Sequence, residues 1–578
     1  MAHLSDVQRP PIEFVPELDR LTVDAMTDWK VPGAAVAVVR GGELIFAKAY
    51  GHRNFEEKLP ATTATQFLIG SITKSFTATA MALLHNEGRL DWTKPVRDYI
   101  PEFRLHDPVA TDRVTVSDLL CHQSGLPRHD WVWLPNDRTP HELLGAMWHL
   151  ELSRDIRSAY QYNNLCYNVA GLLIQRVSGQ SYEAFVRARL TDKLGMKVSF
   201  TLDDLEASAD AARPYAIHED TRLPAIRLAV GTIAAGAMNT SVADLANWMR
   251  LHLGKGEFEG KRLLSATLID ALHAPRVYFT EPGYPEFGQA HYGLGFRCQS
   301  YRDDRLVWHG GGLVGWGARI TLVPDFGIGV AVLTNRSPSE VPTALTCYII
   351  DRLRGREPID WRERFRKNRE QLFAQMQASK VERERARHKH TRPAHDLPDY
   401  TGDYEHLAYG VMSIRVRDGA LHWSWRGMSA AMGHRHYETF ELPEAPDRLL
   451  PDRLAITFLT DRDGHIVSLS APLEPMVKDI VFTRLAAGDC TDPEFRARCV
   501  GTFKGGPTTH RVTLDTEGQL MLKPDNQPAY RLVPQDGQRF RVLELEGFVV
   551  EFRGEGATVD EVIFHQPNGT FAARRFEE

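Results

Sequence analysis

The chain has 578 residues, of which 43% are hydrophobic and 25% charged, and its formal net charge at pH 7 is −6. A chain of this length exceeds what one hydrophobic core supports, so we expect several domains with the composition of an ordinary folded protein. The weak acidic excess gives no basic field for nucleic acid or an anionic membrane, and neither is expected as a partner. A small molecule or short peptide fits better as a substrate.

The N-terminus and the cysteines indicate a cellular compartment. Residues 1–10 contain no apolar core of the kind a secretory signal needs, and no later run approaches the length of a membrane span. The six cysteines have neither the density of a disulfide scaffold nor CxxC spacing for zinc. We therefore expect a cytoplasmic protein with reduced thiols in its core.

Residues 1–355 mix two kinds of pattern. Strand-like runs such as Gly33–Val39 and Ile328–Leu333 alternate with helical patterns at Ser75–Gly88 and Ser241–Gly254. The mixture predicts one domain of α and β structure. Both helical patterns stop at a glycine, which predicts a left-handed cap at each end.

Residues 356–393 differ in composition from what precedes them. From Trp361 to Arg392 the chain is rich in Arg and Glu, and it contains neither Gly nor Pro before Pro393. This pattern predicts a surface helix that links two domains. Acidic residues interspersed with the basic ones argue against a nucleic-acid role.

The remaining chain has the sequence pattern of β-strands throughout and contains an internal repeat. Val411–Arg417 and Leu421–Trp425 alternate on either side of a turn, which indicates a hairpin. Tyr400–Tyr404 aligns with Cys499–Phe503 at an offset of 99 residues, and Asp418–Leu421 aligns with Glu517–Leu520 at the same offset. We predict two β-domains, residues 394–488 and 489–578, each a small barrel that closes its edges.

A Ser-x-x-Lys sequence lies at the start of the first helical pattern. Ser71 follows Gly70 and opens an apolar helix, so its N–H belongs to the unpaired donors of a helix start. Lys74 shares a helix face with it, and burial would disfavour the charged form of that lysine. A serine hydroxyl needs such a base to act as a nucleophile. The tetrapeptide is common by chance, so the prediction depends on its partner motifs.

Two later motifs accompany it. Tyr162-Asn163-Asn164 precedes another apolar helix, and His309-Gly310-Gly311-Gly312 lies before a strand. In this order the three motifs resemble the serine β-lactamase and penicillin-recognising hydrolase family. The flanks resemble its class C and esterase branch, and the resemblance covers residues 15–350; these flanks are Val114–Pro127, Leu194–Met196, Ala235–Leu245 and Tyr292–Phe296.

The resemblance implies a fold and a set of roles. The expected catalytic domain is α/β (α+β), with an antiparallel sheet flanked by helices, and the two domains after it would be lipocalin-like barrels. Ser71 would be acylated, and Lys74 and Tyr162 would together carry out the proton transfers. Asn164 would hold Lys74 or the substrate amide. A phenol base needs a nearby cation, which Lys74 and a protonated His309 could supply.

The glycines after His309 complete the implied site. The N–H groups of Ser71 and Gly312 would form an oxyanion hole, and glycine at 310 to 312 would let strand and substrate approach closely. Gly311 and Gly312 are therefore expected in the substrate and oxyanion site. The resemblance implies no cofactor and no metal. His106, His122, His129 and Asp130 lie near one another in sequence but lack the i, i+4 pairing of a helical zinc site.

The residue type at position 309 indicates which class of substrate to expect. β-Lactamases and carboxypeptidases of the family usually carry Lys there, and a histidine is a weaker anchor for a carboxylate. The family's D-aminopeptidases and some esterases resemble this chain in carrying His. The resemblance thus implies a D-aminopeptidase or D-amino acid amidase ahead of a carboxylesterase. A β-lactamase-like or D-Ala carboxypeptidase-like hydrolase and a non-catalytic binding relative remain alternatives.

The two β-domains resemble the tail of the D-stereospecific aminopeptidase, whose C-terminal barrel sends a loop to the active site. Lys523–Pro528 or Pro534–Gly537 could supply such a loop here, although packing or oligomerisation is an equally good role for both barrels. A homo-oligomer is allowed by the sequence but not indicated by it.

Overall fold

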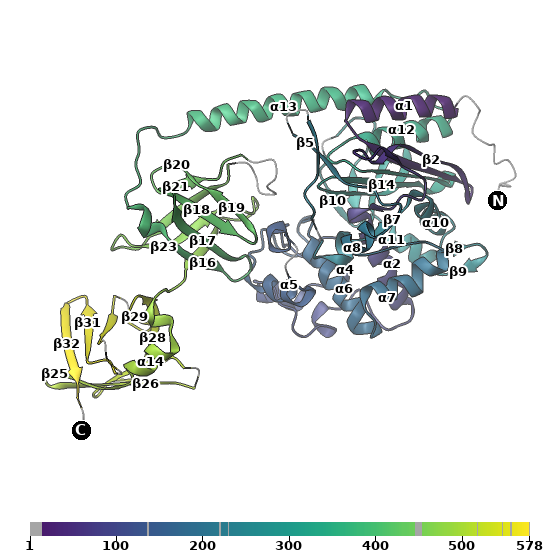
Figure 1. Cartoon of the computed structure of the whole chain (residues 1–578). Helices are drawn as coiled ribbons and strands as arrows, with labels where there is room; N and C mark the ends of the chain where they lie inside the picture. Colours follow the sequence, from purple (N-terminus) through teal and green to yellow (C-terminus); the bar gives the residue numbers. More distant parts are fainter. Residues whose placement is uncertain are drawn as a thin grey trace.

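The computed structural model describes residues 14–135, 138–218, 221–228, 230–281, 283–444, 453–516, 518–545, 547–554, 556 and 558–576. Figure 1 shows a large α and β domain followed by two β-domains in a row, with the C-terminal barrel farthest from the first domain. In the described part of the chain, no helix has the length and apolar character needed to cross a membrane. All six cysteines are free and buried, as predicted.

An antiparallel sheet of nine strands forms the centre of the first domain, in the order β10-β11-β12-β13-β14-β15-β1-β2-β3. Alternate residues of β1 enter two different cores: Ala35 and Ala37 lie in one, Val36 and Val38 in the other. Both faces are therefore covered, which explains the unbroken apolar run. The strands are β1 Gly33–Arg40, β2 Glu43–Asn54, β3 Leu59–Pro60, β10 Val277–Phe279, β11 Ala290–Tyr292, β12 Arg297–Tyr301, β13 Asp304–Leu313, β14 Trp316–Val323 and β15 Ile328–Thr334.

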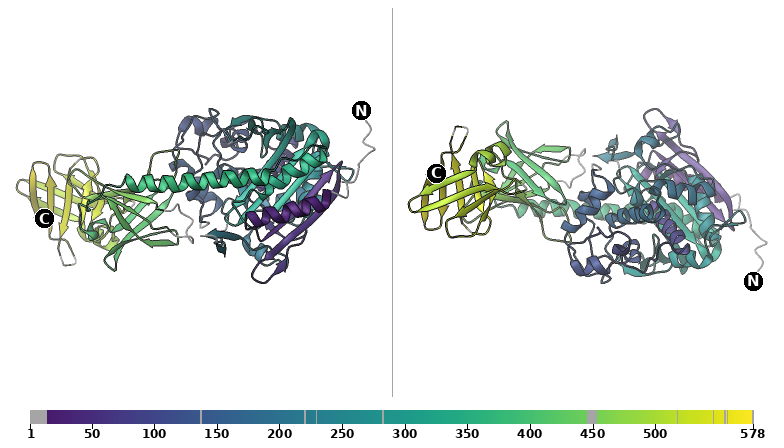
Figure 2. Two further views of the ribbon diagram at one scale, coloured as in Figure 1. Left: turned by 90° about the horizontal axis from the view of Figure 1, so that it is seen from above. Right: turned by 90° about the horizontal axis from the view of Figure 1, so that it is seen from below.

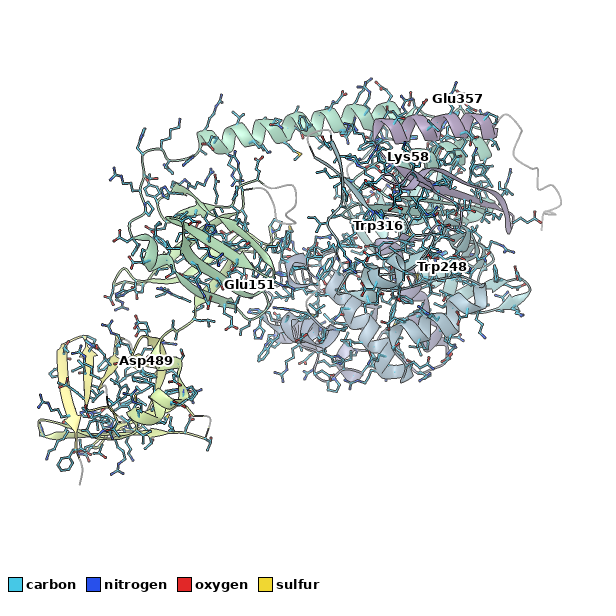
Figure 3. The ribbon with its side chains drawn as sticks, in the orientation of Figure 1. Lys58, Glu151, Trp248, Trp316, Glu357 and Asp489 are labelled. Atoms are coloured by element: carbon cyan, nitrogen blue, oxygen red, sulfur yellow. The ribbon has the colours of Figure 1, made fainter. Side chains whose placement is uncertain are left out.

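Helices cover the two faces. On one face α1 (Phe14–Asp28) and α12 (Val341–Leu353) bury Leu18 and Leu345, and on the other α2 (Thr73–Asn86) and α10 (Val242–Leu253) bury Phe76 and Trp248. The rings of Phe76 and Trp248 stack with centroids 3.7 Å apart, and Figure 3 places Trp248 inside this layer. The helical region around α2 contains α3 Pro108–Arg113, α4 Val116–Leu120, α5 Pro140–Ala146, α6 Asn164–Ser178, α7 Tyr182–Val186, α8 Leu202–Glu206, α9 Ile233–Gly236 and α11 Ala266–Leu272.

The two predicted glycine caps differ. Gly88 after α2 is left-handed with φ +68°, as predicted. After α10 the left-handed residue is Lys255 (φ 52°), whereas Gly254 has φ −76°, so the prediction for Gly254 is wrong. A glycine is needed there for a different reason, because a Cβ on Gly254 would clash with the carbonyl oxygen of Glu257.

The charged stretch forms α13 (Trp361–Arg385), which runs from the first domain to the first β-domain (Figure 2). Its first turns bury Trp361 and Phe365 against the sheet domain. Ion pairs along its exposed surface include Arg366 with Glu363 at 2.7 Å and with Glu370 at 2.6 Å. Such pairs support a solvated helix only modestly. In its last turn, Arg383 pairs with Glu441 of the first β-domain at 3.4 Å.

The first β-domain is a nine-stranded antiparallel sheet, not the closed barrel that the sequence predicts. Its end strands β19 and β20 are consecutive in the chain but do not pair with each other: β19 pairs with β18, a ladder that the bond from the Met432 N–H to the Leu421 carbonyl extends, and β20 pairs with β21. The sheet therefore curls nearly closed without pairing its edges. The strands are β16 Gly402–His406, β17 Gly410–Arg417, β18 Ala420–Trp425, β19 Met428–Ala431, β20 Gly433–His436, β21 Thr439–Glu441, β22 Ala455–Thr460, β23 Ile466–Ala471 and β24 Ile480–Arg484.

The second β-domain is a closed eight-stranded barrel, as predicted, preceded by α14 Pro493–Cys499. Its first strand repeats the first strand of the preceding domain, since Tyr404 pairs with Arg484 and Phe503 pairs with Arg575. Both tyrosine and phenylalanine are fully buried. The strands are β25 Gly501–Gly505, β26 Thr508–Leu514, β27 Leu520–Pro524, β28 Tyr530–Asp536, β29 Arg539–Val542, β30 Val549–Arg553, β31 Glu561–Gln566 and β32 Gly569–Arg575.

A tight contact between β13 and the segment before α2 yields a prediction. A Cβ on Gly311 would overlap the carbonyl oxygen of Ile69, whereas a Cβ on Gly310 would find only ordinary contacts, at 3.7 Å and beyond. We expect Gly311→Ala to lower the free energy of unfolding by about 2–4 kcal/mol, and the matched control Gly310→Ala to change it by less than about 1 kcal/mol. Urea unfolding followed by tryptophan fluorescence measures both. Equal effects of the two substitutions would contradict the steric argument.

Candidate active site

Ser71 lies where α2 meets β13. A single 3₁₀ turn, Gly70–Ile72, precedes α2, and Gly70 has φ +52°. A Cβ on Gly70 would stand only 2.9 Å from the backbone nitrogen of Gly312. Glycine at position 70 thus allows the left-handed turn and the close approach of the strand. The consequence is a partly exposed serine at a helix start, directly beside Gly312.

Lys74 is fully buried one helical turn after Ser71. Its Nζ donates to Ser71 Oγ at 3.1 Å, to Asn164 Oδ1 at 2.8 Å and to the carbonyl oxygen of Ala235 at 2.8 Å. These three acceptors match the three N–H groups of an ammonium ion. Burial nevertheless lowers the pKa of Lys74 below its usual value of 10.5, because the charged form loses hydration.

Tyr162 contacts the same hydroxyl from the other side. Its phenol donates to Ser71 Oγ at 2.8 Å, and the Nζ of Lys74 stands 4.8 Å from the centre of its ring. Burial raises the pKa of Tyr162, but the charge and hydrogen bonding of Lys74 outweigh it, and the net pKa is lower than usual. The pKa values of Lys74 and Tyr162 are both lowered, which brings them closer to neutral pH. A proton can therefore pass between Ser71 and this pair.

Asn164 is the first residue of α6. The side chain of the preceding Asn163 caps the helix by accepting from the N–H of Cys166 at 2.9 Å. This cap fixes the direction in which Asn164 points. Its amide oxygen accepts from Lys74, and its amide nitrogen donates to Asp130 Oδ1 at 3.2 Å. Both ends of the Asn164 amide are therefore engaged, and its orientation is set.

His309 lies on β13 behind the site and is 1% exposed. Its Nδ1 is 2.7 Å from the carbonyl oxygen of Gly310, which can only accept, so Nδ1 carries the proton. Its Nε2 accepts from the hydroxyl of Tyr292 at 2.8 Å. Burial, followed by the charges of Arg297 and Lys74, lowers the pKa of His309 well below its usual range. The imidazole is therefore neutral at pH 7. Of the two cations expected to stabilise a phenolate at Tyr162, Lys74 and a protonated His309, only Lys74 remains.

A cavity of about 150 Å³ opens over Ser71. Gly312 lines it, whereas Gly311 lies behind, against Ile69, and His309 is not among the lining residues. The lining residues are Gly70, Ser71, Arg128, Asp130, Trp133, Leu134, Asn164, Val230, Thr232, Ala235, Gly236, Gly312 and Leu313.

The second barrel contributes none of these residues. Of the two loops considered for capping the site, Pro534–Gly537 contacts the link between the β-domains instead, where Gly537 bonds to Ala487 and Cys490. Lys523–Pro528 begins in the last two residues of β27 and continues beyond it in the same distant barrel (Figure 1).

The loop after Pro127 supplies residues whose roles the sequence did not indicate. Arg128 Nε donates to Asp130 Oδ2 at 2.6 Å, and its guanidinium lies 5.1 Å from the ring centre of Tyr162. Trp133 Nε1 donates to Asp130 Oδ1 at 2.9 Å. The sequence indicated Asp130 only as an unsuitable metal ligand, because its bond to Asn164, 34 residues along the chain, depends on the fold.

His122 lies beneath Tyr162. It is fully buried, accepts from the N–H of Asn163 at 3.2 Å and has its ring centre 4.4 Å from that of Tyr162. Burial and the charge of Lys74 lower its pKa well below the usual range, so it is a neutral support for the tyrosine. Within the described ranges, no three His, Cys, Asp or Glu residues are grouped to hold a metal ion.

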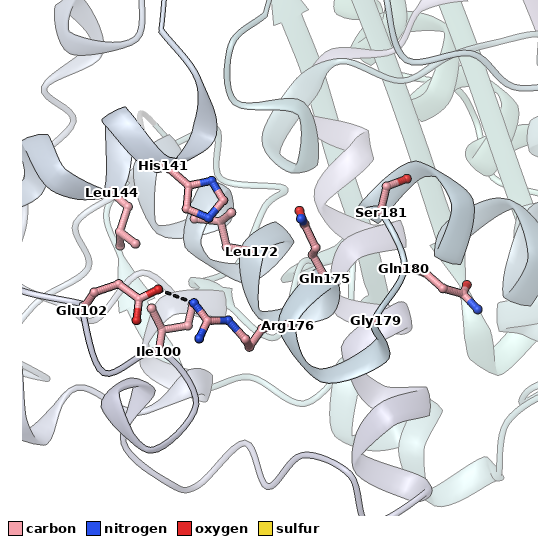
Figure 4. A pocket seen from close by; sticks show the side chains of 10 residues that line it. All are labelled: Ile100, Glu102, His141, Leu144, Leu172, Gln175, Arg176, Gly179, Gln180 and Ser181. Carbon is pink, nitrogen blue, oxygen red and sulfur yellow. Dashed lines mark hydrogen bonds and ion pairs between the residues drawn. The ribbon is translucent and has the colours of Figure 1, made fainter.

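A larger hollow of about 340 Å³ lies at the other end of α6 (Figure 4). Gln175 and Arg176, near the C-terminus of that helix, line it, and Arg176 is paired with Glu102. A helix of 15 residues separates this end from Asn164 by about 20 Å. The larger hollow contains no nucleophile with a base, and the smaller cavity is the better candidate for chemistry.

Comparisons with known proteins find matches to the first domain and to the first β-domain. The family model "Beta-lactamase" matches residues 18–351, and "Domain of unknown function (DUF3471)" matches residues 386–484. The unguisins hydrolase ungD' of Aspergillus campestris is 30% identical over 417 residues, which cover 67% of this chain and 75% of that protein. Protein flp of Staphylococcus aureus is 27% identical over 334 residues, covering 56% of this chain and 64% of flp.

A solved structure shows the same fold. The octameric penicillin-binding protein homologue from Pyrococcus abyssi superposes with a TM-score of 0.53 at 23% identity, covering 81% of this chain and all of that one. At this identity the likeness shows the fold alone.

The lowered pKa values of Lys74 and Tyr162 predict a pH profile. The pair is catalytically useful once it has lost one proton, so kcat/KM should rise with pH through a midpoint below 10, the usual pKa of tyrosine. Lys74→Arg and Tyr162→Phe should each lower kcat by about 10²–10⁴-fold. The control Tyr160→Phe removes a buried hydroxyl with no hydrogen-bond partner among the described residues and should stay within about threefold. A full loss in the control would contradict the assignment.

Proposed function

The chain belongs to the beta-lactamase family, and from this premise we propose that it cleaves an amide or ester bond of a small substrate through an acyl-enzyme on Ser71. One observation carries the proposal. Ser71 Oγ accepts from both Tyr162 and the buried Lys74, at 2.8 and 3.1 Å, at the wall of a cavity. This arrangement of a nucleophile, a base and an orienting group is the one that acyl transfer requires.

The proposed reaction follows from these contacts. After the Lys74–Tyr162 pair loses one proton, it accepts the proton of Ser71, whose oxygen attacks the substrate carbonyl. The N–H groups of Ser71 and Gly312 bind the oxyanion, each such donor contributing about 3 kcal/mol to the transition state. The pair then protonates the leaving group, and a water molecule deacylates Ser71 by the reverse transfers.

We infer that the substrate is small and that the activity is that of a D-aminopeptidase or D-amino acid amidase. A neutral His309 provides no cation for a substrate carboxylate. The Arg128–Asp130 pair on the cavity wall carries no net charge, so it does not repel the amine of an aminoacyl group. Two fungal relatives, at 30% and 27% identity, are named unguisins hydrolases.

A carboxylesterase is the second candidate. Apolar side chains make up much of the cavity wall, including Trp133, Leu134, Val230 and Leu313, and these suit an uncharged acyl group. A carboxylate substrate, as in a β-lactamase or carboxypeptidase, would find only Arg128, which Asp130 already neutralises.

A substrate panel tests the proposal. We expect D-alanyl p-nitroanilide to be cleaved faster than its L-alanyl isomer and faster than p-nitrophenyl acetate or a chromogenic cephalosporin. Ser71→Ala should abolish every activity, and EDTA should leave them unchanged. Turnover of the cephalosporin well above the others would overturn the assignment, and preference for the acetate would favour the esterase. A folded protein that forms no fluorophosphonate adduct on Ser71 would be a binding relative.

A further inference from the structure

The first β-domain contacts the loop that forms one wall of the cavity. Arg426 lies in the turn between β18 and β19 with φ 47°. Its guanidinium donates to the backbone carbonyl of Trp131, and to those of Val132 at 3.1 Å, Leu134 at 2.8 Å and Pro135 at 2.8 Å. The two terminal nitrogens of one planar group thus contact four carbonyls, three of which share the two hydrogens of Nη1, in a segment whose only regular secondary structure is one 3₁₀ turn.

The same domain holds the loop at His129. This residue is fully buried and left-handed, with φ 44°. Its backbone N–H donates to the carboxylate of Glu474 at 2.8 Å, and its Nδ1 is 2.7 Å from the hydroxyl of Tyr409. Because its Nε2 faces the carbonyl oxygen of Glu151 at 3.1 Å, Nε2 carries the proton and Nδ1 accepts from Tyr409. Figure 3 shows Glu151 where the two domains meet.

The inner side of the loop faces Asn164, which bonds to Lys74. Asp130 follows His129 directly, accepts from Trp133 and Arg128, and receives a hydrogen bond from the amide nitrogen of Asn164 at 3.2 Å. The amide oxygen of Asn164 accepts from Lys74. An unbroken series of contacts therefore leads from the β-domain through the loop to the ammonium beside the nucleophile.

The interface is packed as a core. Tyr409 and Trp425 are buried in the same continuous hydrophobic cluster as Trp133 of the loop and Phe76 of α2. The ring centres of Trp131 and Trp425 lie 6.5 Å apart. Since close-packed interiors transmit displacement, a shift of this interface would move the loop.

We propose that the first β-domain, Gly402–Arg484, is a positioning element of the active site, with Arg426 holding the loop that orients Asp130 and Asn164. This rests on the proposed role of Ser71 as nucleophile. The domain does not enter the cavity, and Arg426 is a positioning residue because it acts through the loop. The proposal thus gives the region that matches the domain of unknown function a role in setting the geometry of the Ser71 site.

The test uses the full chain and two probes that need no knowledge of the substrate. The rate at which a fluorophosphonate modifies Ser71 and kcat/KM for p-nitrophenyl acetate are measured for Arg426→Ala, Asp130→Asn and the double variant. We expect Arg426→Ala to lower both rates by about 10–100-fold, as misplacement by an ångström does. The double variant should be no slower than the slower single variant, because both changes break one series of contacts.

The matched control is Arg415→Ala. Arg415 lies on β17 of the same domain, pairs with Asp403 at 2.7 Å and bonds to the carbonyls of Gly402 and Ile414, all within the β-domain. Its removal should leave both rates within about twofold. Circular dichroism and thermal unfolding report the folded fraction, to which the rates are normalised. Arg426→Lys, which keeps the charge but loses the planar fork, should give an intermediate loss and replaces Arg426→Ala if that variant does not fold.

The outcomes separate the two proposals. Wild type that forms no adduct at Ser71 refutes the proposed nucleophile. A reactive wild type with an equally reactive, folded Arg426→Ala refutes the positioning role alone. Losses that multiply in the double variant also refute it, because Arg426 and Asp130 would then act independently.

Discussion

The buried ammonium of Lys74 is the constraint on which the rest of the site depends. A charge without water is tolerated only if its hydrogen-bonding groups are matched, and here the three acceptors come from three different segments: Ser71, Asn164 and Ala235. The turn before α2, the start of α6 and the short helix α9 must therefore keep their relative positions. The same burial lowers the pKa of Lys74 and makes the lysine useful as a base.

A second constraint is steric. Ser71 can stand beside Gly312 only because the backbone of Gly70 and that of Gly311 approach their neighbours more closely than a side chain allows. The proposed function uses the same contact, since β13, which packs against the turn before α2, also brings the N–H group of Gly312 to the position proposed for an oxyanion. His309 on the same strand is a neutral, buried support bonded to Tyr292.

The site extends outward through the loop that contains Arg128 and Asp130. One side of this loop faces Asn164 and Tyr162, and the other is bonded to the first β-domain through His129 and Arg426. A loop with so little regular structure takes its shape from what it touches. The β-domain therefore belongs to the physical environment of the proposed catalytic groups, although it contributes no residue to the lining of the cavity.

Short-range patterns in the sequence determined much of the local structure of this protein. The helix start at Ser71, the spacing to Lys74, the capped helix after Asn163 and the hairpin at Asp418 are short-range features, and each could be predicted from the sequence. The neutrality of His309, the pairing of Asp130 with Asn164 and the bonds from Arg426 to residues nearly 300 positions away could not. These depend on burial and on contacts between segments distant in the chain, which no local periodicity encodes, so only the tertiary structure decided them.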